Sequence, residues 1–154
     1  MAETPSDCAH AEHAEPAPTT PSALNAWLQQ KTYRCWAKES EIHPSDGPHG
    51  GNVRVFLNET LDRSLRSTDA STEHPQGSVA VKELWGSGTT ALTGWAVGVK
   101  TAATSDGGAG WYWYEVFSTA PNASGAIEGQ NKPLCSGCHA SGGRDFVLIA
   151  YPLR

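Results

Sequence analysis

The chain has 154 residues, enough for one domain with a substantial core and too few for two comfortable ones. Its formal net charge of -5 and the lack of a sustained basic patch argue against nucleic acid as a partner and against strong attraction to a membrane surface. No run of eighteen apolar residues occurs, so we expect no membrane span and, by exclusion, a small ligand.

Residues 1–21 are rich in Ala, Pro, Glu, Thr and Ser, a composition that buries little surface and orders poorly. We therefore expect a flexible tether over 1–21 and a single domain over 22–154. If the protein is exported, Cys8 and Cys35 form a disulfide that holds the tether to the first helix. The alternative is a buried thiol at Cys35 and a disordered Cys8. We favour the disulfide.

The first predicted element is an amphipathic helix. Ser22 is its expected N-cap, and apolar residues recur at helical spacing from Leu24 up to about Lys38. A stretch crowded with Pro, Gly, Asp and Asn follows at 43–52. It predicts a loop that leads into a strand at 53–57, which is rich in β-branched and aromatic residues.

A short helix is expected after this strand, with Asn58 as its cap and with Leu61 and Leu65 four residues apart on one face. The remaining predicted strands are 78–85, 92–100, 111–117 and 145–153. Because no long helices separate them, we expect a mainly antiparallel sheet of about five strands. The predicted fold class is α+β, with one substantial N-terminal helix and small helices elsewhere.

The sequence LCSGCH near the end of the chain places two cysteines three positions apart, followed directly by a histidine. Thiols at this spacing can add across the two vinyl groups of a haem, and the adjacent imidazole then lies beneath the iron. This predicts a c-type haem attached through Cys135 and Cys138. His139 would be the proximal iron ligand, with its other ring nitrogen held by a carbonyl or a carboxylate.

Two other uses of the motif compete with a haem. A structural zinc site usually has four ligands, and the other pair at this spacing, His10 and His13, lies in the polar N-terminal stretch that we expect to be a flexible tether. A redox-active dithiol is typical of a βαβ pattern, which is also missing. The haem interpretation is therefore favoured.

The opposite side of the iron has no evident ligand in the sequence. The only methionine is Met1, in the polar N-terminal stretch, which argues against the His/Met ligation of many electron-transfer cytochromes. A second histidine ligand is possible in principle from His43, His49 or His74, but these lie in loops punctuated by Pro and Gly, where a solvated histidine is the commoner interpretation. We therefore expect a five-coordinate iron whose open position binds or transforms a small molecule.

Four blocks occur in this order along the chain: HPQGSVAVKELW, GWAVGVK, GWYWYEVF and CSGCHASGGRDFVLIA. Together they resemble the cytochrome P-460 family and its relative cytochrome c′-β, over the region from Trp27 to the end. The resemblance implies an antiparallel sheet, one haem near the end of the chain, a homodimer and a periplasmic location. We expect an exported protein whose export signal is not part of this sequence.

In the namesakes of that family, a lysine of the VKEL strand forms an additional covalent bond to the haem macrocycle, and the matching residue is Lys82. Ser78, Ala80, Lys82 and Leu84 project from one strand face, and the small residues leave room for a flat macrocycle. Burial that lowers the pKa of Lys82 would help, because an attacking amine must be neutral. The alternative is an ordinary Lys-Glu step on a solvated strand.

The namesakes oxidise hydroxylamine with a carboxylate on the distal side of the haem, whereas the matching block here places Ala96 at or near that position. Glu83 and Glu115 are the nearest alternatives. Glu115 shares a strand face with Trp111 and Trp113, so it is either partly buried with a raised pKa or at a wet edge. Without a placed acid, we expect hydroxylamine oxidation to slow by about 10²-fold or more.

Three further residues are candidates for the haem site. Phe56 would line the distal pocket, as aromatic residues do in cytochrome c′-β, although a strand phenylalanine is more often ordinary core. Arg144 and Asp145 follow the motif closely. One of them would orient His139 or a haem propionate, and the alternative is a surface ion pair.

The sequence thus supports two main functions. The first is a periplasmic mono-haem cytochrome with a five-coordinate, lysine-crosslinked haem that binds, and can oxidise, hydroxylamine or nitric oxide. Lys82 and Glu115 would be its catalytic residues, and a redox protein its electron acceptor. The second is a nitric-oxide-binding or scavenging protein without turnover, like cytochrome c′-β, which the missing acid near Ala96 favours. A plain electron carrier is disfavoured by the methionine count.

Overall fold

The computed structural model describes residue 8 and residues 16–67, 69 and 71–154. In this part of the chain the strands are β1 (Ala37–Lys38), β2 (His43–Pro44), β3 (Asn52–Leu57), β4 (Val79–Gly86), β5 (Gly94–Lys100), β6 (Trp111–Val116) and β7 (Ile127–Gln130). The helices are α2 (Pro21–Gln30), α3 (Glu59–Arg66), α4 (Pro133–His139) and the short 3-10 helices η2 (Thr32–Cys35) and η3 (Asp106–Gly108). The α+β prediction is confirmed.

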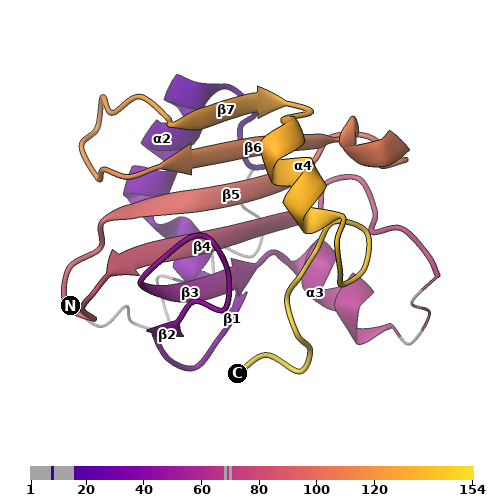
Figure 1. Ribbon diagram of the computed structural model, residues 1–154, viewed down its shortest axis with the longest axis horizontal. Helices are drawn as coiled ribbons and strands as arrows, with labels where there is room; N and C mark the ends of the chain where they lie inside the picture. The colour runs from indigo at the N-terminus through magenta and orange to yellow at the C-terminus, as the bar shows by residue number, and fades with distance from the viewer. Residues whose placement is uncertain (1–7, 9–15, 68, 70) are drawn as a thin grey trace.

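All seven strands belong to one antiparallel sheet in the order β1-β3-β4-β5-β6-β7, with β2 also paired to β3. Figure 1 shows α2 behind this sheet and α4 crossing its front, so the two helices cover opposite faces. The chain between β2 and β3 also crosses the front, on the side of α4. Among the helices of the described residues, none combines the length and apolarity needed to cross a bilayer.

Each face of the sheet carries its own apolar cluster, because side chains alternate along every strand. The cluster under α2 consists mainly of Leu24, Leu28, Tyr33, Phe56, Val81, Trp95, Val97 and Tyr114. The cluster under α4 consists of Val55, Leu57, Leu61, Trp111, Trp113 and Val147. The sheet is therefore buried on both faces over its central strands. Side chains two residues apart on a strand point to the same face.

The predicted strands at 53–57, 78–85, 92–100 and 111–117 match β3 to β6. The predicted short helix is α3, and the Asn58 side chain caps it by accepting a hydrogen bond from the Leu61 amide at 3.1 Å. β1, β2 and β7 were not expected. The first two are only two residues long, and the sequence of β7, IEGQ, lacks the β-branched and aromatic run that marks a strand.

The first helix differs from the prediction at both ends. It begins at Pro21 with Thr20 as its N-cap, in place of Ser22, in keeping with the preference for proline in the first helical turn. It ends at Gln30, well before Lys38, because Lys31 adopts a left-handed conformation with φ of 57°. The chain then continues through η2.

The predicted strand at 145–153 is wrong. Asp145 and Phe146 have φ of 47° and 65°, so the backbone turns sharply here, and its only described pairing is the isolated bridge between Arg144 and Val147. Val147 instead belongs to the cluster under α4, and Phe146, Ile149 and Leu153 pack against it. The run is apolar because it packs over the core without joining the sheet.

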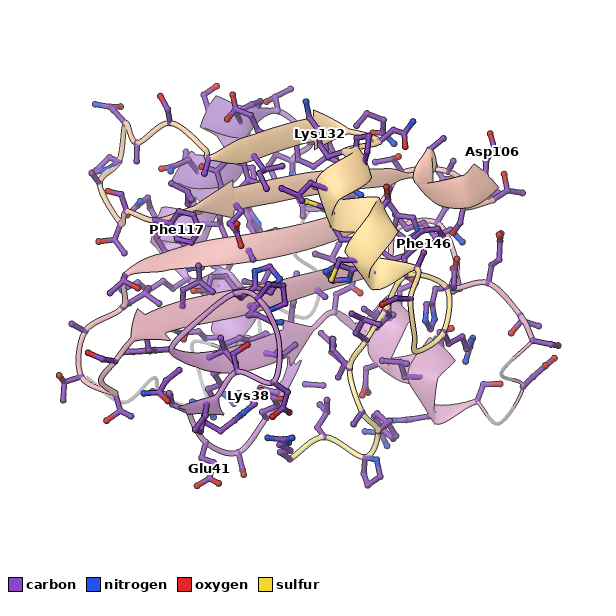
Figure 2. All side chains as sticks on the ribbon, viewed as in Figure 1. Lys38, Glu41, Asp106, Phe117, Lys132 and Phe146 are labelled. Atoms are coloured by element: carbon purple, nitrogen blue, oxygen red, sulfur yellow. A yellow bond between two sulfur atoms is a disulfide. The ribbon has the colours of Figure 1, made fainter. Side chains whose placement is uncertain are left out.

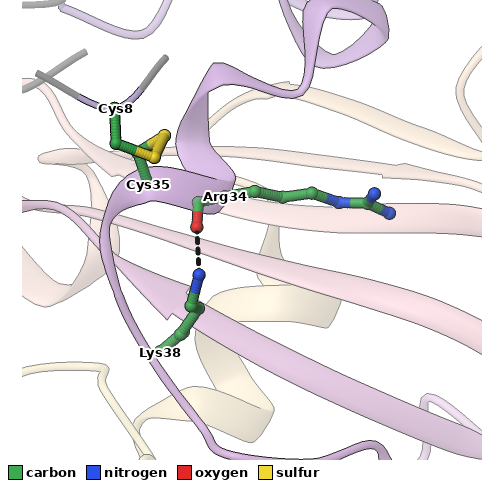
Figure 3. Close-up of a disulfide and its surroundings, with 4 residues drawn as sticks. All are labelled: Cys8, Arg34, Cys35 and Lys38. Carbon is green, nitrogen blue, oxygen red and sulfur yellow. Dashed lines mark hydrogen bonds between the residues drawn. A yellow bond between two sulfur atoms is a disulfide. The ribbon is translucent and has the colours of Figure 1, made fainter. Parts of the chain in front are cut away.

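The predicted disulfide between Cys8 and Cys35 is confirmed. It attaches to η2, not to the first helix as expected, and Figure 3 shows it near Arg34, whose carbonyl accepts a hydrogen bond from Lys38 Nζ at 2.7 Å. The predicted tether, 1–21, lies mainly outside the described residues. Of its described part, Ala17 is buried in the cluster under α2.

Candidate functional site

Helix α4 carries both cysteines of the CSGCH motif. Cys135 is half-buried against the apolar cluster, Cys138 is exposed, and both are free thiols within the described residues. The helix lies close to η3, because a Cβ added to Gly108 would lie 2.6 Å from the Cβ of Ser136. Burial raises the pKa of the Cys135 thiol, which is opposite to the low pKa of a nucleophilic redox cysteine.

His139 is the last residue of α4, and its ring orientation is fixed by the chain that follows. Its Nδ1 donates a hydrogen bond to the carbonyl oxygen of Phe146 at 2.8 Å, and its ring lies 4.7 Å from the Trp113 ring between centroids. Figure 2 shows Lys132 at the start of α4 and Phe146 beside the other end of the helix. The Phe146 carbonyl is thus the hydrogen-bond partner that the sequence predicts for His139. Burial lowers the pKa of His139, which favours the neutral ring, and the hydrogen bond from Nδ1 to the carbonyl then leaves the lone pair on Nε2.

The turn that presents the Phe146 carbonyl is held by the side chain of Asp145. Asp145 Oδ2 accepts hydrogen bonds from Lys100 Nζ at 2.9 Å and from the His74 amide at 2.6 Å, and Oδ1 accepts one from the Ser105 hydroxyl. Lys100 is buried and also donates to the His74 carbonyl at 2.6 Å. Two adjacent left-handed non-glycine residues are costly, and this buried network stabilises them.

Arg144 does not reach His139 in this structure. It donates to the carbonyl oxygens of Ser64 at 2.9 Å and of Thr72 at 2.8 Å, and so ties the C-terminal segment to the end of α3. His74 fills the space between them: the Ser64 hydroxyl contacts its Nδ1 at 2.8 Å, and its Nε2 donates to the Arg144 carbonyl at 3.1 Å. Arg144 therefore anchors the C-terminal segment, and its predicted contact with a haem propionate stays a prediction.

Lys82, Ala96 and Glu115 lie side by side on the face of the sheet that α4 covers. They are directly paired across β4, β5 and β6, and Val55 continues the same row on β3. Lys82 is half-buried and, among the described residues, forms no ion pair. Burial lowers its pKa, and Glu39, Glu115 and Cys138 are among the nearby groups that oppose the shift. A lowered pKa favours the neutral amine that the crosslink prediction requires.

His49 joins this row from the loop between β2 and β3. Its Nδ1 lies 2.5 Å from Glu115 Oε2, both side chains are mostly buried, and its ring is 6.3 Å from that of His139 between centroids. The sequence suggested a solvated loop histidine at this position. The contact joins residues 66 positions apart, so only the register of the sheet reveals it.

Two residues of the predicted site lie on the other face of the sheet. Phe56 is buried under α2, with its ring packed edge-on against Tyr33 at 5.2 Å between centroids, and is ordinary core. Glu83 is also buried there, where it accepts hydrogen bonds from the Tyr33 hydroxyl at 2.6 Å and from Arg34 Nε at 2.7 Å. Phe56 and Glu83 are therefore separated from the CSGCH motif by the sheet. Val55, the neighbour of Phe56, holds the position beside Lys82.

The residues present fit a covalently attached haem. Two free thiols and an imidazole with an available lone pair come from one helix, and the sheet beneath presents the small residues Ala80, Ala96 and Gly98 on its two central strands. Trp113 leans over Gly98, and its buried Nε1 has no hydrogen-bond partner within the described residues. Among those residues, no group of three or more metal-binding side chains is gathered as a zinc site would require.

In comparisons with known proteins, the chain matches no protein-family model and no curated protein sequence. The likeness to the cytochrome P-460 family therefore stays a prediction that depends on the four sequence blocks.

Proposed function

We propose that this protein is an exported mono-haem c-type cytochrome of the P-460 kind. Cys135 and Cys138 would hold the haem by thioether bonds, His139 would be the proximal iron ligand, and Lys82 would be bonded to the macrocycle. The observation that carries the proposal is the placement of Lys82 against α4: a half-buried lysine on β4 shares one face of the sheet with a complete CSGCH motif.

The bound haem would supply a five-coordinate iron that accepts hydroxylamine or nitric oxide and exchanges electrons with a redox partner protein. The protein residues prepare that chemistry. The Phe146 carbonyl fixes the tautomer of His139, and burial favours the neutral amine of Lys82. Joining Lys82 Nζ to a carbon of the macrocycle would break one N–H and one C–H bond and release two protons and two electrons, so it would require a two-electron oxidant of the peroxide class.

Glu115 distinguishes an enzyme from a simple binder. It is paired directly with Ala96, so a carboxylate on β6 lies next to the position where the sequence lacks one on β5. There it can accept a proton from a bound hydroxylamine, which favours oxidation. The second candidate is nitric-oxide binding without turnover. It is favoured by the hydrogen bond that already engages Glu115 with His49.

The cellular setting follows from the cysteines. Disulfides persist in oxidising compartments, and thioether attachment of haem belongs to exported cytochromes, so the bond between Cys8 and Cys35 supports a periplasmic location. Homodimer formation is proposed from the family resemblance alone.

The direct test is the absorption spectrum of holoprotein produced with export and haem attachment. We expect a ferrous Soret band shifted strongly to the red of ordinary c-type haem, and a return to an ordinary position in Lys82→Ala. Lys38→Ala, at an exposed lysine on β1, is the matched control and should leave the band unchanged. Colourless wild-type protein would overturn the haem proposal, and identical spectra for wild type and Lys82→Ala would overturn the crosslink.

Turnover is tested separately, with hydroxylamine and an artificial electron acceptor. If Glu115 accepts the proton, Glu115→Gln should lower kcat by about 10²-fold while the ferrous Soret band keeps the red shift that marks the Lys82 bond. Wild-type holoprotein that binds nitric oxide but does not consume hydroxylamine would establish the binding function in place of the enzyme.

A further inference from the structure

His49 and His139 are the two imidazoles that the fold brings together at the site. His139 ends α4, whereas His49 comes from the loop between β2 and β3, on the same side of the sheet. Their ring centroids are 6.3 Å apart and the ring planes are inclined by 64°. Since metal–imidazole bonds are about 2 Å long, the centroids of two imidazoles on opposite sides of one metal ion are about 6 Å apart.

The two rings are also held in the same way. His139 Nδ1 donates to the Phe146 carbonyl at 2.8 Å, and His49 Nδ1 donates to the Glu115 carboxylate at 2.5 Å. Each hydrogen bond uses Nδ1, so in the neutral ring the lone pair lies on Nε2. Within the described residues, no hydrogen bond reaches either Nε2. A ring fixed through one nitrogen by a carbonyl or carboxylate, with the other free, is the usual arrangement of a metal-binding histidine.

The other histidines of the domain lack this arrangement. His43 uses both ring nitrogens, with the Pro44 carbonyl at 2.8 Å and Glu39 Oε2 at 2.9 Å. His74 is fully buried, and both its nitrogens are engaged by Ser64 and Arg144. Within the described residues, His49 is thus the histidine that shares with His139 both a position at the site and a free Nε2.

We propose that His49 is a displaceable second ligand of the haem iron, opposite to His139, with Glu115 as its supporting partner. The inference rests on the proposed function and refines it. The iron would be five-coordinate only after His49 has left it, when an incoming ligand can bind. Glu115 strengthens His49 as a ligand, because a hydrogen-bonded carboxylate raises imidazole basicity.

The loop that carries His49 is suited to such displacement. It is closed by a hydrogen bond from the Ser45 amide to the Gly51 carbonyl at 2.9 Å, and Gly50 and Gly51 have φ of 59° and 64°. Gly51 also packs directly on the backbone of Gly86, where a Cβ would clash. The loop is therefore anchored at its end, and moving His49 requires rearrangement of a few loop residues without breaking a pair between the long strands.

The test compares the ferric holoproteins of the wild type and His49→Ala by absorption and electron paramagnetic resonance. We expect low-spin iron in the wild type and high-spin iron in His49→Ala, with nitric oxide binding at least about tenfold faster once the competing ligand is removed. Glu115→Gln should give a mixture of the two spin states. His43→Ala, in the same segment of the chain but engaged elsewhere, is the matched control and should keep the wild-type spectrum.

A wild-type protein that is already high-spin, with a spectrum and nitric oxide binding rate unchanged in His49→Ala, would overturn the inference while leaving the proposed function intact. Absence of covalent haem in the wild type would instead overturn the proposed function. Intact mass of each variant shows whether haem is attached and so separates the two outcomes.

Discussion

Lys100 is one of the most deeply buried charged side chains of the protein, with 1% of its surface exposed. Its ammonium group lies 2.9 Å from Asp145 Oδ2 and 3.6 Å from Glu73 Oε2, and it holds the turn after α4 to the end of β5. A buried ion pair adds little stability over an apolar pair, but the loss of one partner leaves the other charge uncompensated. Lys100 thus contributes to stability by neutralising the buried charge of Asp145.

We therefore expect Lys100→Met to lower the free energy of unfolding by about 3–5 kcal/mol, because Asp145 would remain buried without its cation. Urea denaturation monitored by tryptophan fluorescence measures this loss. Lys38→Met, at an exposed lysine, is the control and should change stability by no more than about 0.5 kcal/mol. Equal stability of the two variants would show that the Asp145 turn is held by other contacts.

His74 makes stability depend on pH. Its pKa is lowered to about 4, chiefly by burial and next by the positive charge of Arg144. The unfolded chain takes up this proton near pH 6.5 and the folded chain only near pH 4, so stability is complete above about pH 6.5 and falls as the pH drops toward 4. The loss attributable to His74 is at most about 3 kcal/mol.

His74→Gln keeps a donor and an acceptor but cannot be protonated. We expect its free energy of unfolding to fall less than that of the wild type between pH 7 and pH 5, by roughly 2 kcal/mol. Urea denaturation at the two pH values provides the comparison, which uses differences within each protein and so tolerates a uniform loss of stability. Parallel losses in both proteins would show that other groups carry the pH dependence.

At the scale of elements, η3 sets the position of α4. Gly108, with φ of 107°, lies where any side chain would meet Ser136 on the helix. Gly108→Ala should therefore push α4 away from the sheet, lower stability by about 1–3 kcal/mol and reduce haem attachment. Gly107→Ala is the matched control: its φ of 64° is also left-handed, but a Cβ there meets nothing within 4 Å.

Comparison of the two glycine variants separates backbone strain from steric displacement of the helix. Thermal unfolding measures the loss of stability that backbone strain causes. The haem content of purified protein measures the effect of displacing the helix. If both variants attach haem equally well, the contact between η3 and α4 does not determine the geometry of the motif.

The sequence predicts those elements that local patterns mark clearly. The alternation in β3 to β6 and the Asn58 cap of α3 are such patterns. The end of α2 was missed because Lys31, which adopts the left-handed conformation, is not one of the residues that usually mark a C-cap. The run at 145–153 looked like a strand because covering segments and strands are equally apolar; long-range packing decides between them.

The candidate site shows the same division. The motif residues and Lys82 could be proposed from the sequence, because local spacing and the four sequence blocks mark them. Phe56 lies in the core under α2, which was the commoner interpretation of a strand phenylalanine, and not in the predicted distal pocket. His49 was set aside as a solvated loop histidine, because its partner Glu115 lies on β6 and the two meet only through the packing of a loop on the assembled sheet.

For the whole molecule, the disulfide joins residues 27 positions apart and ties the N-terminal region to η2. Replacing both Cys8 and Cys35 by serine should lower the free energy of unfolding by about 2–4 kcal/mol, because the unfolded chain regains the freedom that the bond removes. Denaturation with and without a reducing agent measures this. The wild type should lose a similar amount on reduction, whereas the serine variant should be insensitive to it.

The sheet also lies between the cysteine of the disulfide in η2 and the first cysteine of the CSGCH motif. Cys35 lies in η2, whose Tyr33 packs in the cluster under α2, whereas Cys135 packs in the cluster under α4 on the opposite side. Once the strands have paired, the sheet lies between Cys35 and Cys135, which disfavours disulfide exchange between them. In an oxidising environment, folding itself would therefore leave the CSGCH thiols available to react with haem vinyl groups instead of with Cys8 or Cys35.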